Sequence, residues 1–335
     1  MRNNFASHFL LVVLMMLAAP GTNAQSSAST ANDLWTAVPD ADFVASFNVH
    51  RIVNEALPRI LGDDSAAKKD LENGIVGIRA LSGLDVRRIM RAVVGAQLVG
   101  TGLDVNLQEV VVVAEGEFNY NDIKDVVKGP HREMREEKYG AYTLLVFREY
   151  DDPNAKKNEL VAVVMLGPNL MAGGHLNAVK RAVDAFRDGK GRASADLVAR
   201  AQSDPDALVS LAARIPAAYL QPKGSDGSTN RLTRLLLSIK DLEATLQLGE
   251  NGFPLMVAVR SDSSDSASDI KCMLDSARTI ASLAITDKTA MKVLDDLKIT
   301  LDGNAAVVQT EITMDQIRSI MNPPKPAQAT KPVKQ

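Results

Sequence analysis

The feature that most constrains the fold is an alternation of short apolar strands with amphipathic helices, which recurs in both halves of the chain. In the second half, runs at 298–301 and 305–312 flank Asp302-Gly303-Asn304, and another hairpin turn lies at 250–252. Gly and Asn between two alternating runs are typical of β-hairpins. Hairpin-linked strands with helices between them predict an α+β fold, with mainly antiparallel sheets and helices packed on one face.

The two halves resemble each other in the order of their predicted elements. The tripeptide Pro-Asp-Ala opens the first strand of each half, at 39–41 and at 205–207. A helix follows the third strand of each half, so both read as β-α-β-β-α-β-β. Such internal similarity predicts a duplicated unit. We therefore expect two tandem related α+β modules, at 39–203 and 204–321.

The first 24 residues predict export. Arg2 precedes an unbroken apolar run at 9–19, and small residues lead to a predicted cleavage between Ala24 and Gln25. This pattern is typical of a secretory signal peptide. The run is shorter than the ~20 residues that a membrane-spanning helix needs. No cysteine lies near the cleavage site, so we expect no stable membrane anchor after cleavage and a periplasmic or extracellular location.

The composition indicates a globular exported protein without disulfides. A linker at 25–38 and a Pro- and Lys-rich tail at 322–335, expected to be disordered, flank the modules. The net charge of −3 argues against nucleic acid as a partner, because nucleic acid selects basic surfaces. Cys272 is the single cysteine, so stability must come from packing. Its apolar helical surroundings predict a buried, inert thiol.

The residues offer no recognisable catalytic, cofactor or metal site. His50, His131 and His175 are the histidines of the mature chain, and none has the spacing of metal ligands. No nucleophile elbow or phosphate-binding loop is present. Glu115 and Glu117 occupy alternate positions of a predicted strand, which favours a solvated face over an acid/base pair. We interpret the mixed-charge run at 132–138 as a solvated loop, with a partner-docking surface as the alternative.

One weak candidate for an anion site lies where a strand leads into a helix. Gly173 and Gly174 precede His175 at the predicted helix start. Backbone N–H groups exposed behind glycines at a helix N-terminus can hold an anion. A tight turn that merely tolerates glycine is the simpler explanation.

Several structural motifs of the first two thirds carry a resemblance. These are the tripeptide at 39–41, Gly116-Glu117-Phe118, Tyr139-Gly140 and an apolar strand leading to an Ala/Val-rich helix at 166–186. With them the chain resembles a loose group of uncharacterised exported bacterial proteins. The resemblance implies a bacterial envelope protein, and it transfers no catalytic residue.

Three functions remain open from the sequence. The first is an exported, non-catalytic binding or interaction protein of the bacterial envelope, whose partner is an unknown envelope protein or a small ligand. The second is a periplasmic carrier of an apolar small molecule or lipid, for which 12 methionines offer adaptable pocket walls. The third is an enzyme of unrecognised type. An enclosed apolar cavity would favour the carrier, and converging polar groups in a cleft would favour the enzyme.

Overall fold

The computed structural model describes residues 32–101, 104–128, 133–148, 160–216, 231–285 and 288–321. The predicted signal peptide with its cleavage site at Ala24 and Gln25, residues 25–31 of the predicted linker and the tail at 322–335 lie outside the described residues.

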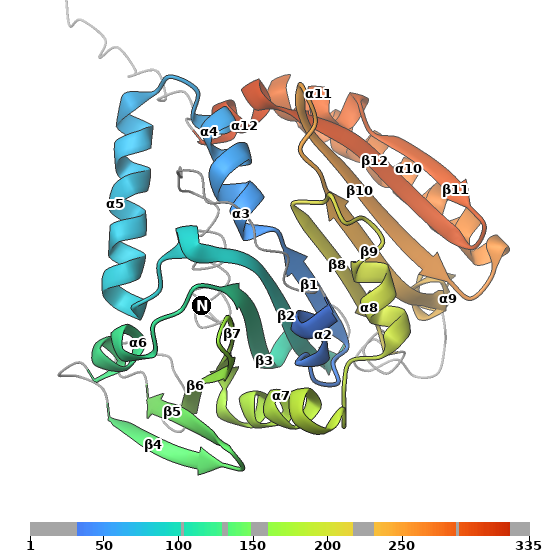
Figure 1. The fold of residues 1–335 in the computed structure, drawn as a ribbon. Coiled ribbons are helices and arrows are strands. Elements are labelled where there is room, and N and C mark those ends of the chain that lie inside the picture. Colours follow the sequence, from blue (N-terminus) through green and yellow to red (C-terminus); the bar gives the residue numbers. More distant parts are fainter. Residues whose placement is uncertain are drawn as a thin grey trace, which may run out of the picture.

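The described strands form one sheet of twelve, in the order β11-β12-β10-β9-β8-β1-β2-β3-β7-β6-β5-β4 (Figure 1). Every neighbouring pair is antiparallel. The strands are β1 (Phe43–Phe47), β2 (Ile89–Thr101), β3 (Asp104–Gly116), β4 (Met134–Tyr139), β5 (Tyr142–Arg148), β6 (Leu160–Gly167), β7 (Leu170–His175), β8 (Val209–Arg214), β9 (Ile239–Leu246), β10 (Gly252–Ser261), β11 (Lys298–Asp302) and β12 (Ala305–Thr313). The predicted α+β class with antiparallel pairing is confirmed.

Helices connect and cover these strands. They are α2 (Asn32–Thr36), α3 (Val49–Arg51), the π-helical turn η1 (Ile52–Ala56), α4 (Leu57–Leu61), α5 (Ser65–Ser82), the 3-10 turn η2 (Val86–Arg88), α6 (Tyr120–Val127), α7 (Leu176–Asp188), α8 (Ala195–Ala201), α9 (Arg231–Ser238), α10 (Ser264–Ala284), α11 (Lys288–Asp295) and α12 (Met314–Met321). Among the described helices, none combines the length and the apolar character that crossing a membrane requires.

The two halves repeat one strand order and share the sheet. β1-β2-β3-β7-β6 of the first half corresponds to β8-β9-β10-β12-β11 of the second, and the halves join where β1 pairs with β8. The first half differs by an additional hairpin, β4–β5, which extends the sheet beyond β6. The repeat therefore runs outward in both directions from the centre of the sheet.

Helices cover both faces of the sheet in the first half, where the sequence analysis expected one face. Val111 and Val113 of β3 pack in a core with α2, α7 and α8. Their neighbour Ala114 packs in another core, with Leu71 and Ile75 of α5. Successive strand residues point to opposite faces, so an apolar run such as the centre of β3 needs cover on both sides.

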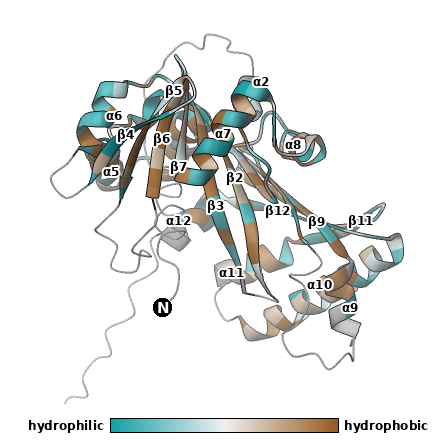
Figure 2. Cartoon of the chain, turned by 90° about the horizontal axis from the view of Figure 1, so that it is seen from below, coloured by the Kyte–Doolittle hydropathy of each residue, from teal (hydrophilic) through white to brown (hydrophobic). Residues whose placement is uncertain are grey.

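In the second half, one face of the sheet stays open. α9, α10 and α11 lie on one side of β9–β12, and α8 lies on the other side, packed against β8 and β1 (Figure 2). The cross-strand row Thr245, Met256, Gln309 and Lys298 spans β9, β10, β12 and β11 on the α8 side. Gln309 and Lys298 are exposed. Polar residues alternate with apolar ones here, as expected for a sheet with one solvated face.

The charged run at 132–138 is not a loop where it is described: Met134–Tyr139 forms β4, an end strand of the sheet. Glu137 binds Lys180 of α7 at 2.6 Å and Arg135 at 3.0 Å. Charged side chains are common on end strands, because they prevent pairing with other chains. The charges that suggested a loop are those of a protected edge.

Candidate functional site

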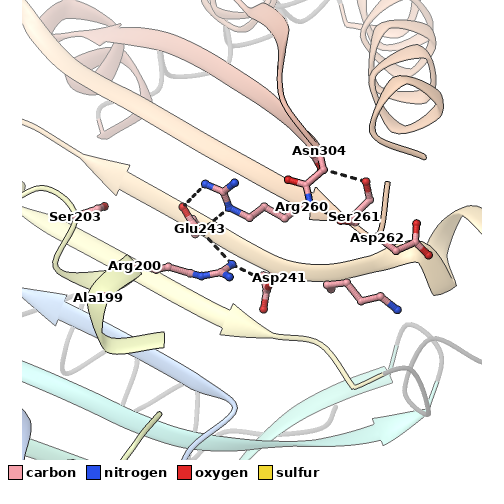
Figure 3. A pocket seen from close by; sticks show the side chains of 10 residues that line it. Ala199, Arg200, Ser203, Asp241, Glu243, Arg260, Ser261, Asp262 and Asn304 are labelled. Atoms are coloured by element: carbon pink, nitrogen blue, oxygen red, sulfur yellow. Dashed lines mark hydrogen bonds and ion pairs between the residues drawn. The ribbon is translucent and has the colours of Figure 1, made fainter. Parts of the chain in front are cut away.

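The candidate site lies on the open face of the second half, beside α8 (Figure 3). A pocket of about 530 Å³ opens there between α8, β9, β10 and the β11–β12 turn. Its lining is mainly polar and comprises Ala199, Arg200, Ser203, Lys240, Asp241, Glu243, Arg260, Ser261, Asp262 and Asn304.

Alternation along β9 and β10 places the charged side chains of this pocket. Asp241 and Glu243 are two residues apart and so share a face, and Asp241 lies opposite Arg260 in the register of β9 and β10. Arg200 comes from the last turn of α8. Leu197 of α8 is buried in the core beneath, which fixes the helix against the sheet.

These four charged residues form a connected ion-pair network. Glu243 Oε1 accepts from Arg260 Nε at 2.8 Å and from Arg200 Nη1 at 3.3 Å. Arg200 Nη1 also lies 2.8 Å from Asp241 Oδ2. The pKa of Arg260 is raised above its ordinary value, chiefly by its hydrogen bond to Glu243. Two arginines thus neutralise two carboxylates in a half-buried position.

A second pocket, of about 680 Å³, continues the first along the same face and shares Ser203 with it. Its charged lining residues are the carboxylates Asp204, Asp296 and Glu311 and the ammonium group of Lys298. Asp296 and Glu311 are exposed, and Asp204 accepts a hydrogen bond from Gln247. We call the second pocket, with these three carboxylates, the acidic trough.

The arrangement is suited to recognition by hydrogen bonds and charge. In the first pocket, Glu243 binds Arg260 and Arg200, and Asp241 binds Arg200, so both carboxylates are occupied by ion pairs within the protein. In the acidic trough, carboxylates outnumber the single ammonium group. A basic ligand laid across the ends of β9, β10, β12 and β11 would meet these carboxylates in succession, since Asp204 binds Gln247 after β9, Glu311 of β12 lies opposite Pro254 of β10, and Asp296 precedes β11.

The glycines of the predicted anion site lie in β7 and not in a separate turn. A Cβ on Gly174 would lie 2.3 Å from the carbonyl oxygen of Val110, and its φ is +147°. Close approach of β3 therefore requires glycine at this position. His175 is the N-cap of α7, and its Nδ1 accepts a hydrogen bond from the backbone N–H of Val110 at 3.0 Å. Packing accounts for these residues, and the anion site remains a prediction.

The other residues singled out in the sequence are scattered. His50 Nδ1 lies 2.9 Å from Asn54 Nδ2, and His131 lies outside the described residues. Glu117 lies beyond the end of β3 and pairs with Arg88 at 3.5 Å. Within the described ranges, no group of three metal-ligating side chains occurs. The prediction that Cys272 is buried is wrong: it lies on the exposed side of α10.

Sequence reasoning did not single out Arg200, Glu243 or Arg260. A signal existed in the run 241–246, where acidic and polar residues alternate strictly with apolar ones. That alternation predicts one solvated strand face with charges in a row. The arginine partners come from α8, a helix the sequence analysis did not predict, and from β10.

Fold and site together define an α+β protein with an internally repeated antiparallel sheet and an open polar face on its second half. A scan against protein-family models and a search of curated proteins find no match. Among solved structures, TP0453 in crystal form IV is similar, with a TM-score of 0.45 and 11% identity over 86% of this chain and 95% of that one. TP0453 in crystal form III gives a TM-score of 0.44 and 10% identity over 89% and 99%. At these TM-scores the similarity carries no information on function.

Proposed function

We propose that the protein is an exported, non-catalytic binding protein of the bacterial envelope, and that its acidic trough holds a basic, extended segment of a partner protein. The observation that carries this proposal is the open strand face with Asp204, Asp296 and Glu311 along it. The first half offers no comparable face among its described strands, because helices bury both sides there.

The contents of the two pockets favour this function over a carrier of apolar molecules. Both pockets are open to solvent and lined largely by charged and polar residues. Carriers of apolar ligands need enclosed, mainly apolar cavities. The carboxylates of the first pocket are already paired with arginines, which makes acid/base chemistry there a weaker alternative.

A labelled peptide of alternating Lys and Ser tests the proposal, with a Glu/Ser peptide as its charge-reversed counterpart. Fluorescence anisotropy should show binding of the Lys/Ser peptide that weakens with salt. The double variant Asp296→Asn, Glu311→Gln should weaken that binding about fivefold, because two exposed ion pairs at about 0.5 kcal/mol each contribute about 1 kcal/mol.

The matched control removes two exposed carboxylates from the first half, Asp70→Asn with Glu117→Gln. It changes the net charge equally and should leave the affinity within about twofold. Equal weakening by both double variants would mean that only net charge matters, and the trough would not be the site. Equal binding of the Lys/Ser and Glu/Ser peptides would also overturn the proposal.

A further inference from the structure

β11 ends the sheet in the second half, and within the described residues no strand pairs with its outer side. The opposite end, β4, is protected by charges: Glu137 binds Lys180 and Arg135, and Glu136 binds Lys124. The only charged residues of β11 are Lys298 and Asp302, at its two ends. Between them, the apolar Leu301 is 46% exposed. β11 thus lacks the protection that proteins usually give to end strands.

The internal repeat shows what this edge accepts. β11 corresponds to β6, since β11 pairs with β12 as β6 pairs with β7. In the first half, the outer edge of β6 is filled by β5 in antiparallel register. The second half has no described counterpart of the β4–β5 hairpin. The geometry of the fold therefore provides for an antiparallel strand at the outer edge of β11.

The sequence of β11 is complementary to itself when reversed. In Lys-Ile-Thr-Leu-Asp, an antiparallel copy centred on Thr300 places Lys298 opposite Asp302 at both ends. Ile299 then lies opposite Leu301, and Thr300 lies opposite itself. Opposite charges and apolar pairs directly across two strands each stabilise pairing. We propose that β11 pairs antiparallel with β11 of a second copy of this chain, around a two-fold axis at Thr300.

The hydrogen-bonding phase of the β11–β12 hairpin supports this register. Its loop is the two-residue turn Gly303-Asn304, with Asp302 opposite Ala305. A two-residue hairpin closes on a hydrogen-bonded pair, so Asp302, Thr300 and Lys298 direct their backbone groups towards β12. Ile299 and Leu301 direct theirs outward. In the proposed register these two residues face each other across the axis and can exchange both hydrogen bonds.

α10 adds apolar surface near this edge. Its Arg278 donates to the carbonyl oxygen of Leu297, the residue before β11, at 2.8 Å. Ile280 and Leu283, in the following turn, are 67% and 84% exposed. A two-fold axis perpendicular to the sheet keeps the α10 side of both copies on the same side. A five-residue strand pair alone is small, so we expect a weak dimer that forms at high protein concentration.

A charge exchange tests the register. Asp302→Lys places lysines opposite each other at both ends, and Lys298→Asp places carboxylates opposite each other. Each single variant should weaken self-association at least about tenfold, since like charges directly opposite destabilise pairing. The double variant Lys298→Asp, Asp302→Lys restores both ion pairs and should regain the wild-type dimer. Sedimentation equilibrium over a concentration series measures the association.

Cross-linking provides a second measurement that is independent of charge. In a Cys272→Ser background, Thr300→Cys should form an intermolecular disulfide under mild oxidation, because facing residues of a non-hydrogen-bonded pair lie within disulfide range. Leu301→Cys is the matched control: it faces Ile299 and should cross-link about tenfold more slowly. A mixture of Ile299→Cys and Leu301→Cys chains should cross-link readily.

Three results would overturn the proposal. One is a wild-type chain that stays monomeric at every concentration tested. Another is a double charge variant that associates no better than the single variants, which would point to an edge that takes a strand from a different protein. The third is cross-linking of the Leu301→Cys chain at the rate of the Thr300→Cys chain. Circular dichroism of each variant establishes that it is folded.

Discussion

The substitution Glu243→Gln tests whether the ion-pair network of the first pocket stabilises the fold. The Glu243 side chain is 10% exposed and binds Arg260 and Arg200, whose side chains are 33% and 23% exposed. Removing one partner of a fully buried ion pair costs about 3–5 kcal/mol, whereas surface pairs contribute about 0–1 kcal/mol. Both arginines reach water, and Arg200 retains Asp241. We therefore expect Glu243→Gln to lower the free energy of unfolding by about 2 kcal/mol.

Urea denaturation followed by circular dichroism measures this loss as a shift of the midpoint at constant slope. Glu311→Gln, an exposed change of the same chemistry on the same face, should stay within about 0.5 kcal/mol of wild type. Adding Arg260→Gln to Glu243→Gln should cost less than the two single changes together, by a coupling of about 0.5–3 kcal/mol. If Glu243→Gln costs no more than Glu311→Gln, the network does not stabilise the fold.

Two further predictions concern the first half. Gly174→Ala should destabilise the fold by about 3 kcal/mol, because its Cβ would meet the Val110 carbonyl oxygen in a strained backbone conformation. Gly77→Ala, in helix α5 with open space around it, should stabilise the fold by about 0.5–1 kcal/mol. The urea midpoint should fall in the first variant and rise in the second. The pKa of Glu137 is lowered from 4.5, chiefly by the hydrogen bond that Lys180 donates to it. The ionised Glu137 therefore contributes to the free energy of unfolding above pH 4.5, and this contribution is lost as the pH falls through the lower pKa of the folded state. Thermal unfolding should therefore show a decline below pH 4.5 that is shallower in Glu137→Gln, and an equal decline in both chains would contradict this assignment.

The fold class and the repeat could be predicted because hairpin turns and strand alternation are local signals. The turn at 302–304 and the helix at 176–188 lie where the sequence places them, within a few residues. The single shared sheet could not be predicted, because the pairing of β1 with β8 joins segments more than 160 residues apart. The coverage of both faces has one local signal, the unbroken apolar run at 110–114 in the centre of β3.

The site was harder to predict for a related reason. Asp241 and Arg260 face each other within the predicted β9–β10 hairpin, but Arg200 joins them only through the tertiary fold, which places α8 where Arg200 binds Asp241 and Glu243. Nothing in the local sequence marks an exposed carboxylate as part of a row rather than as ordinary solvated surface. β4 shows the same limit, since edge protection and a charged loop have the same composition.

The acidic trough and the β11 edge lie on the same half of the sheet. The two proposals together therefore predict a dimer with two peptide-binding troughs. A two-fold axis perpendicular to the sheet places both open faces on the same side, and Lys298 of the trough would be neutralised by Asp302 of the second copy. Two Lys/Ser peptides joined by a flexible linker should then bind much more tightly than one, by up to about 10²–10⁴-fold if the linker spans both troughs.

The ratio of tandem to single affinity cancels any direct effect of a substitution on peptide binding. Asp302→Lys should lower this ratio to that of two independent sites, and the Lys298→Asp, Asp302→Lys chain should restore it. A ratio that is unchanged by Asp302→Lys would mean that the troughs act alone, whatever the affinity of each.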